Sequence, residues 1–176
     1  MTLDDFMKFY NDFYMPAYSD LVGYLGDKPA QVIVEVENIA VHLIRVIDPK
    51  CSGKQQEENL QKAYNHLVRV TIDCLKILWV ELGKDIGKMH TTASLIKKGL
   101  LVDEDVFLAA HLAFKDLSCK ARRLEMDNVG TDPLKCLDLY GELVNLGWSI
   151  VRLRDDEKMK KVLLDLFPED EIPSPV

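Results

Sequence analysis

Hydrophobic residues recur along this chain at intervals of three and four, the spacing that places them on one face of an α-helix. No segment alternates with period two over a useful length, apart from residues 32–36, where helix-start signals argue against a strand. The pattern therefore predicts an all-α protein, an up-and-down helical bundle of four to six helices. We expect residues 1–167 to form a single domain and the acidic, proline-rich residues 168–176 to form a C-terminal tail.

The bundle is predicted to be built around a long central helical hairpin with arms at residues 31–48 and 55–82. The helical rhythm continues beyond the second arm, so residues 55–98 form either one long helix or two. Gly83 and Gly87 favour a break, because each glycine in a helix interior costs about 1 kcal/mol relative to alanine.

Shorter helices are expected on either side of this hairpin. An aromatic helix begins after Thr2, is kinked or broken by Pro16, and ends at Gly26. A further helix begins after Asp103, which is a good N-cap residue, and another begins near Pro133.

Each arm of the hairpin carries one thin polar stripe in an otherwise apolar helix. The stripe of the first arm consists of Gln31, Glu35, Asn38, His42 and Arg45. The stripe of the second arm consists of Asn59, Lys62, His66, Arg69, Asp73 and Lys76. Two interpretations are open: both stripes are ordinary solvent-facing surfaces, or they face each other and form a seam inside the hairpin. Because both helices are otherwise apolar, the pattern also suggests that they are covered on most sides.

If the stripes meet, the seam is a candidate site. Its charged residues sum to 4 − 2 = +2 with neutral histidines, in a chain whose net charge is −7, so a protein or an anionic ligand is a possible partner. Candidate catalytic residues are the histidines His42 and His66 as general acid or base, with Arg45 or Arg69 stabilising negative charge and Asp73 as a nearby carboxylate.

The histidines also raise the question of a metal. His42, His66 and His111 lie on different predicted helices, and three imidazoles that converge in a bundle bind zinc, iron or nickel. The sequence contains no Glu-x-x-His and no His-Glu-x-x-His, the local motifs of metal-binding helices. We therefore predict no metal and no cofactor, and keep a metal-dependent bundle enzyme as a second alternative.

The hairpin at residues 31–82, with a polar cluster between two long helices, resembles the core of HEPN-type helical bundles. The resemblance covers about a third of the chain and implies a dimer, often one that cleaves RNA or acts on nucleotides in defence and toxin systems. The family motif is an arginine, usually followed by a polar residue, with a histidine a few residues further on. Asn38 and His42 match this motif, but Glu37 replaces the arginine, which puts the implied RNA cleavage in doubt.

Composition restricts the partners. An acidic chain has no overall attraction to nucleic acids or to an anionic membrane, and no apolar run approaches the roughly 18 residues of a membrane span. The acidic N-terminus lacks the order of a signal peptide. The four cysteines show no zinc or C-x-x-C spacing, so reduced thiols in a cytoplasm are expected.

Together these observations favour a cytoplasmic, non-catalytic binding or assembly module that forms a homo-oligomer, most simply a dimer. Val68, Ile72 and Trp79 lie opposite the stripe of the second arm and are the expected interface if that helix is not covered within one chain. The alternative is a HEPN-like hydrolase of RNA phosphodiester bonds that uses the seam, in which case a nucleic acid is the partner.

Overall fold

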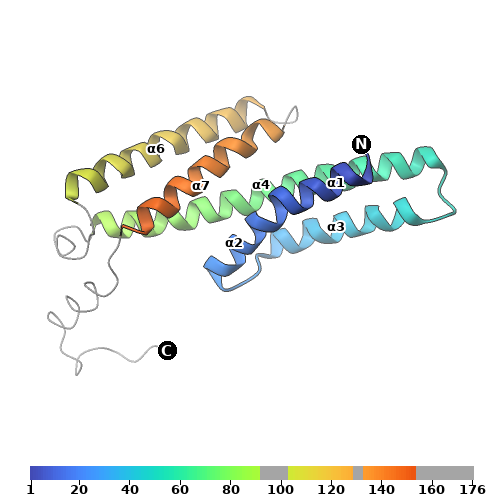
Figure 1. Ribbon diagram of the computed structural model, residues 1–176, viewed down its shortest axis with the longest axis horizontal. Helices are drawn as coiled ribbons and strands as arrows, with labels where there is room; N and C mark the ends of the chain where they lie inside the picture. The colour runs from blue at the N-terminus through green and yellow to red at the C-terminus, as the bar shows by residue number, and fades with distance from the viewer. Residues whose placement is uncertain (92–102, 129–132, 154–176) are drawn as a thin grey trace, which may run out of the picture.

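The computed structural model describes residues 1–91, 103–128 and 133–153, and all regular structure in these ranges is helical. The prediction of an all-α bundle around a long central helix is confirmed (Figure 1). The predicted tail at 168–176 lies outside the described residues. The elements are α1 (Leu3–Phe9), the π-helical turn η1 (Tyr10–Tyr14), α2 (Met15–Leu25), α3 (Ala30–Ile47), α4 (Gly53–Thr91), α6 (Glu104–Asp127), the 3-10 turn η2 (Pro133–Cys136) and α7 (Leu137–Val151).

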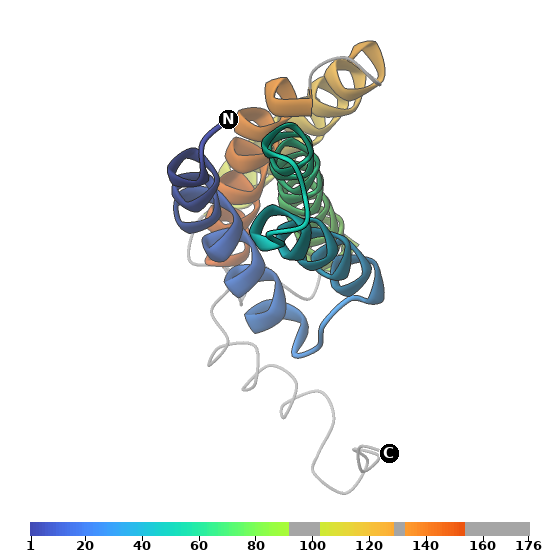
Figure 2. The same cartoon turned by 90° about the vertical axis from the view of Figure 1, so that its right-hand side faces the viewer.

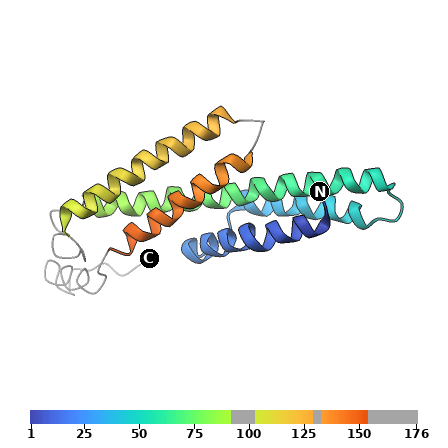
Figure 3. The same ribbon diagram turned by 45° about the horizontal axis from the view of Figure 1, so that its top comes forward.

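Helix α4 is the axis that the other helices share (Figures 1 and 3). Helices α2 and α3 pack along its first half, with α3 antiparallel to it, and α7 packs along its second half. Helix α6 packs mainly against α7 and reaches α4 through side-chain contacts. An end-on view places α3 at the edge of the bundle (Figure 2). No helix among the described residues combines the length and the apolar composition that crossing a membrane requires.

The first helical segment does not break at Pro16. The chain passes from α1 through η1 into α2 in helical conformation, and the Met15 amide donates to the carbonyl of Tyr10, five residues back. This wider turn leaves room for the proline ring. It also tolerates the absence of a backbone amide hydrogen at Pro16. Helix α2 ends at Gly26 as predicted, because Gly26 adopts the left-handed conformation at φ 69° and its amide donates to Val22.

The break predicted between Gly83 and Gly87 is wrong, because α4 is continuous over 39 residues. Leu82, Ile86 and Met89 continue its apolar face and are all buried. Full burial of such side chains contributes about 1.5 to 3 kcal/mol each, which outweighs about 1 kcal/mol for each glycine. Tertiary packing therefore overrides the local helix propensity.

The condition for an interface on α4 is not met, since the candidate residues are already covered within the chain. Val68 and Ile72 are only 2 % and 7 % exposed. Trp79 is half-buried, and its Nε1 donates to Ser118 Oγ of α6 at 2.9 Å. The expectation that the hairpin helices are covered on most sides therefore holds for α4.

Candidate functional site

The polar stripes of α3 and α4 face each other, so the interpretation of both as solvent-facing surfaces is wrong. Helices α3 and α4 run antiparallel, and side-chain hydrogen bonds connect the stripes at three levels. The pairs are His42 Nδ1 with Asn59 Oδ1 at 2.9 Å, His66 Nδ1 with Glu35 Oε2 at 2.7 Å, and Gln31 Nε2 with Asp73 Oδ2 at 2.8 Å. These six residues form the hydrogen-bonded part of the seam.

The two histidines stack at the centre of the seam. Their ring centroids are 5.4 Å apart with an interplanar angle of 23°. A carboxylate accepts but does not donate, so His66 carries its proton on Nδ1 and donates to Glu35. The amide nitrogen of Asn59 donates to the Gln55 carbonyl, which leaves the amide oxygen to accept from His42 Nδ1. Each imidazole is thus oriented by a side chain of the opposite helix.

The cations of the stripes do not gather at this histidine pair. Arg69 lies 3.8 Å from Glu35 but is 60 % exposed, so solvent screens the pair. Arg45 and Lys62 are exposed at the rim, and Asn38 is half-buried. Lys76 points to another partner, Glu125 of α6. The formal excess of positive charge is therefore dispersed, and the charge closest to the histidines is the carboxylate of Glu35.

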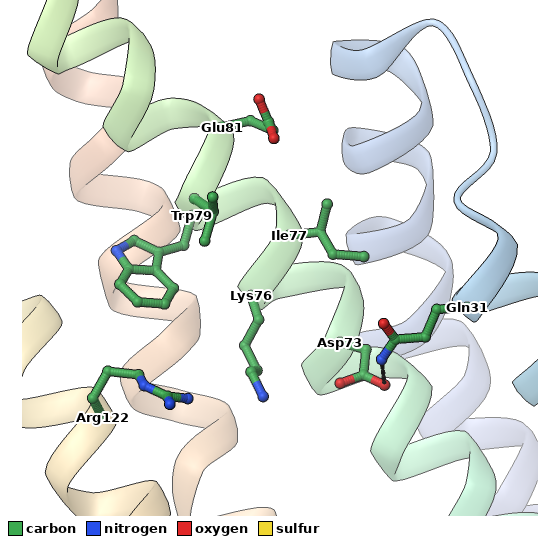
Figure 4. Close-up of a pocket in the computed structure, with 8 residues that line it drawn as sticks. Gln31, Asp73, Lys76, Ile77, Trp79, Glu81 and Arg122 are labelled. Atoms are coloured by element: carbon green, nitrogen blue, oxygen red, sulfur yellow. Dashed lines mark hydrogen bonds between the residues drawn. The ribbon is translucent and has the colours of Figure 1, made fainter.

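Beyond the Gln31–Asp73 pair the surface forms a cavity of about 540 Å³ between α3, α4 and α6, within the range of small-ligand pockets. Figure 4 shows Lys76 between Arg122 and the Gln31–Asp73 pair. Burial raises the pKa of Asp73, and the hydrogen bond from Gln31 only partly offsets this effect. The cavity is lined by Gln31, Asp73, Lys76, Ile77, Trp79, Val80, Glu81 and Arg122.

Glu125 links three helices beside this cavity. It accepts hydrogen bonds from Lys76 Nζ of α4 at 2.6 Å and from the Tyr140 hydroxyl of α7 at 2.7 Å, and it pairs with Arg122 on its own helix. Burial opposes the charge of Glu125, but the hydrogen bonds and neighbouring cations outweigh this and hold its pKa below the usual value. Burial, followed by the bond to Glu125, raises the pKa of Tyr140 to about 12.

The spacing along α6 predicts the Arg122–Glu125 pair but not the other two members of this cluster, because Lys76 and Tyr140 are 49 and 15 residues away from Glu125 along the chain. Helical periodicity relates residues within one element and does not say which turns of two elements meet.

The three candidate metal ligands do not converge. His42 and His66 lie in the seam, whereas His111 is buried on α6 beside Phe107. Within the part of the chain that the structure describes, no three His, Cys, Asp or Glu side chains form a group that would hold a metal ion. No disulfide joins the four cysteines, all of which lie in the described residues, and burial raises the pKa of Cys74 to about 12, which makes it a poor nucleophile.

Helix α3 has the opposite orientation to an ordinary surface helix. Its polar stripe faces α4, and Val32 and Ile39 are buried at the side of that stripe. The expectation that α3 is covered on most sides is wrong, because six of its apolar residues are exposed and only Leu43 and Val46 are half-buried against the core beside Val32 and Ile39. The six exposed residues, which we call the outer face of α3, are Ile33, Val34, Val36, Val41, Ile44 and Ile47, each between 39 % and 78 % exposed.

Comparison of the chain with known protein families, with curated proteins and with solved structures finds no match.

Proposed function

We propose that this protein is a non-catalytic helical binding or assembly module that presents the outer face of α3 to a partner protein. The observation that carries the proposal is the exposure of six β-branched apolar residues on one side of a single helix. They expose on the order of 600 Å², the upper end of the range for the largest apolar patch on a monomer. An amphipathic helix that shows its apolar side to solvent is suited to a groove or a helix of a partner.

The seam supports this proposal because it holds α3 in that orientation. Rotating α3 to bury its outer face would separate Glu35 from His66 and His42 from Asn59. Leaving such partly buried polar groups without partners costs about 1 to 3 kcal/mol each. The histidines and carboxylates of the seam therefore act as positioning residues for the binding surface.

The same geometry favours binding over catalysis. Both histidines use Nδ1 for contacts within the seam, so only Nε2 of each remains for any other contact. A phosphodiester that approached them would meet the negative charge of Glu35, which repels an anion. Hydrolysis of RNA by His42 and His66 stays an alternative prediction. A cytoplasmic location is part of the proposal and is supported by four cysteines, all in the described residues, that no disulfide joins.

The proposal is tested by capture followed by reconstitution. Proteins retained by the wild type are identified, purified and measured for affinity to the wild type and to Ile44→Asp. Leu112→Asp is the matched control, because Leu112 on α6 has the same size as Ile44 and is similarly exposed, at 58 % compared with 62 %. We expect Ile44→Asp to weaken binding at least about tenfold and Leu112→Asp to leave it unchanged. Equal affinity of all three proteins for every purified partner would refute the proposed function.

A further inference from the structure

We propose that the partner of the outer face of α3 is a second copy of this chain, with the two α3 helices antiparallel about a twofold axis near Val41. This inference rests on the proposed function and names its partner. A twofold contact uses the same surface on both copies and closes after two, so it covers both outer faces at once.

The area of the surface agrees with this arrangement. Each copy offers on the order of 600 Å² from the six residues of the outer face, so a pair buries at most about 1,200 Å² from them in total. This total lies at the lower end of the 1,200 to 2,000 Å² typical of specific interfaces, so we expect a dimer that dissociates at micromolar concentration.

Charge complementarity selects the antiparallel orientation. Glu37 and Arg45 are both exposed and flank Val41 on the same side of α3, eight residues apart, which corresponds to about 12 Å along the helix. With the axis at Val41, Glu37 of each copy lies opposite Arg45 of the other, because both are four residues from the axis. A parallel pair would instead place Glu37 beside Glu37 and Arg45 beside Arg45, which repel.

The shapes of the two halves of α3 also suit this orientation. Ala40, beside the axis, has a small exposed side chain, and this lets the two backbones approach closely. The N-terminal half of the face, with Ile33 and Val36, then packs against the C-terminal half of the other copy, with Ile44 and Ile47. Branched side chains on both halves fill the space on either side of the central alanines.

The first test measures the mass in solution by sedimentation at concentrations from about 1 to 100 µM. We expect a dimer for the wild type and for Leu112→Asp, and a monomer for Ile44→Asp. Glu37→Arg and Arg45→Glu should each weaken the dimer about tenfold, and the double variant should restore it, since the opposite charges meet again. Circular dichroism of each variant establishes that it is folded, which is expected because all of these positions are exposed.

The second test measures the orientation by disulfide formation, in a Cys51→Ser, Cys119→Ser background that removes the two thiols that are not buried. A disulfide requires Cα atoms about 4.4 to 6.8 Å apart. Val41→Cys lies on the axis and should crosslink under oxidation. Ile47→Cys should not, because its counterpart lies about 12 residues, or about 18 Å, along the antiparallel helix.

The outcomes separate this inference from the proposed function. A monomeric wild type at about 100 µM would refute pairing with a second copy. The proposed function would then be judged by the affinity of purified partners for the wild type and Ile44→Asp. A dimer that persists in Ile44→Asp would place the interface elsewhere and also refute the inference. Crosslinking of both the Val41→Cys and the Ile47→Cys variants would show parallel helices and refute the antiparallel arrangement.

Discussion

Two glycines of α7 provide a sharp test of how closely the helices pack, because the same substitution is expected to have opposite effects at the two positions. A Cβ atom added to Gly147 would lie 3.0 Å from Leu82 Cδ1 of α4 and 3.1 Å from Phe114 Cε2 of α6. Among the residues that the structure describes, a Cβ atom added to Gly141 would meet nothing within 4 Å. Gly147 thus lies where three helices meet, whereas a methyl group at Gly141 has space in this part of the structure.

The magnitudes follow from two competing effects. Replacing glycine by alanine inside a helix stabilises it by about 0.5 to 1 kcal/mol, and Gly141→Ala should show this gain in full. At Gly147 the added methyl group also overpacks the core, which costs about 1 to 3 kcal/mol. Leu82 offers little relief, because its Cβ would lie 3.3 Å away and its side chain is fully buried. We therefore expect Gly147→Ala to be about 1 to 3 kcal/mol less stable than Gly141→Ala.

Urea unfolding monitored by circular dichroism measures this difference, with unchanged m values as the control for a two-state transition. Thermal unfolding should show the same order, with a separation of about 2 to 4 °C for each kcal/mol. If Gly147→Ala proved as stable as Gly141→Ala, this result would contradict the close packing of α4 and α6 against Gly147 of α7.

Three further predictions concern charges and the histidine pair. Glu125→Gln should destabilise the protein by about 1 kcal/mol near pH 7. Because the folded pKa of Glu125 is lowered, the stabilisation that its charge provides is present above its ordinary pKa of 4.5 and is lost as the pH falls through the folded value. An equal loss of stability in urea unfolding at pH 7 and at pH 3 would contradict this prediction. Asp73→Asn should stabilise the protein by about 0.5 to 1 kcal/mol near pH 7, because the raised pKa of Asp73 shows that burial disfavours its charge, and the asparagine oxygen still accepts from Gln31. The pKa shift of Asp73 is opposite in sign to that of Glu125, so the gain in stability should shrink as Asp73 becomes protonated in acid. Destabilisation by Asp73→Asn at neutral pH would contradict this prediction. Incubation of a labelled RNA with the wild type and with a His42→Ala, His66→Ala double variant should give equal, background levels of cleavage, and faster cleavage by the wild type would favour the hydrolase alternative.

Much of the fold follows from local patterns. The spacing of apolar residues predicts helices throughout, the hairpin of α3 and α4, and the membership of both polar stripes, because a helical period determines which residues share a face. The end of α2 at Gly26 and the start of α6 after Asp103 follow from the preferences of single residues at helix termini. These features depend on interactions within a few residues, so the sequence is sufficient to determine them.

Other features depend on contacts between distant segments. Local glycine content argued for a break in α4, and only the buried contacts of Leu82, Ile86 and Met89 with the neighbouring helices explain its continuity. The cluster around Glu125 likewise requires three helices to be in place.

The orientation of α3 is the decisive example. Its sequence shows one polar and one apolar side, and periodicity alone is compatible with either side facing the bundle. The tertiary structure decides, because α4 presents His66 and Asn59 at the levels of Glu35 and His42, and partly buried polar groups are stable only when they are paired. The sequence by itself therefore determined an amphipathic helix with a polar stripe. Only the packing against α4 turned that stripe inward and left the apolar outer face exposed.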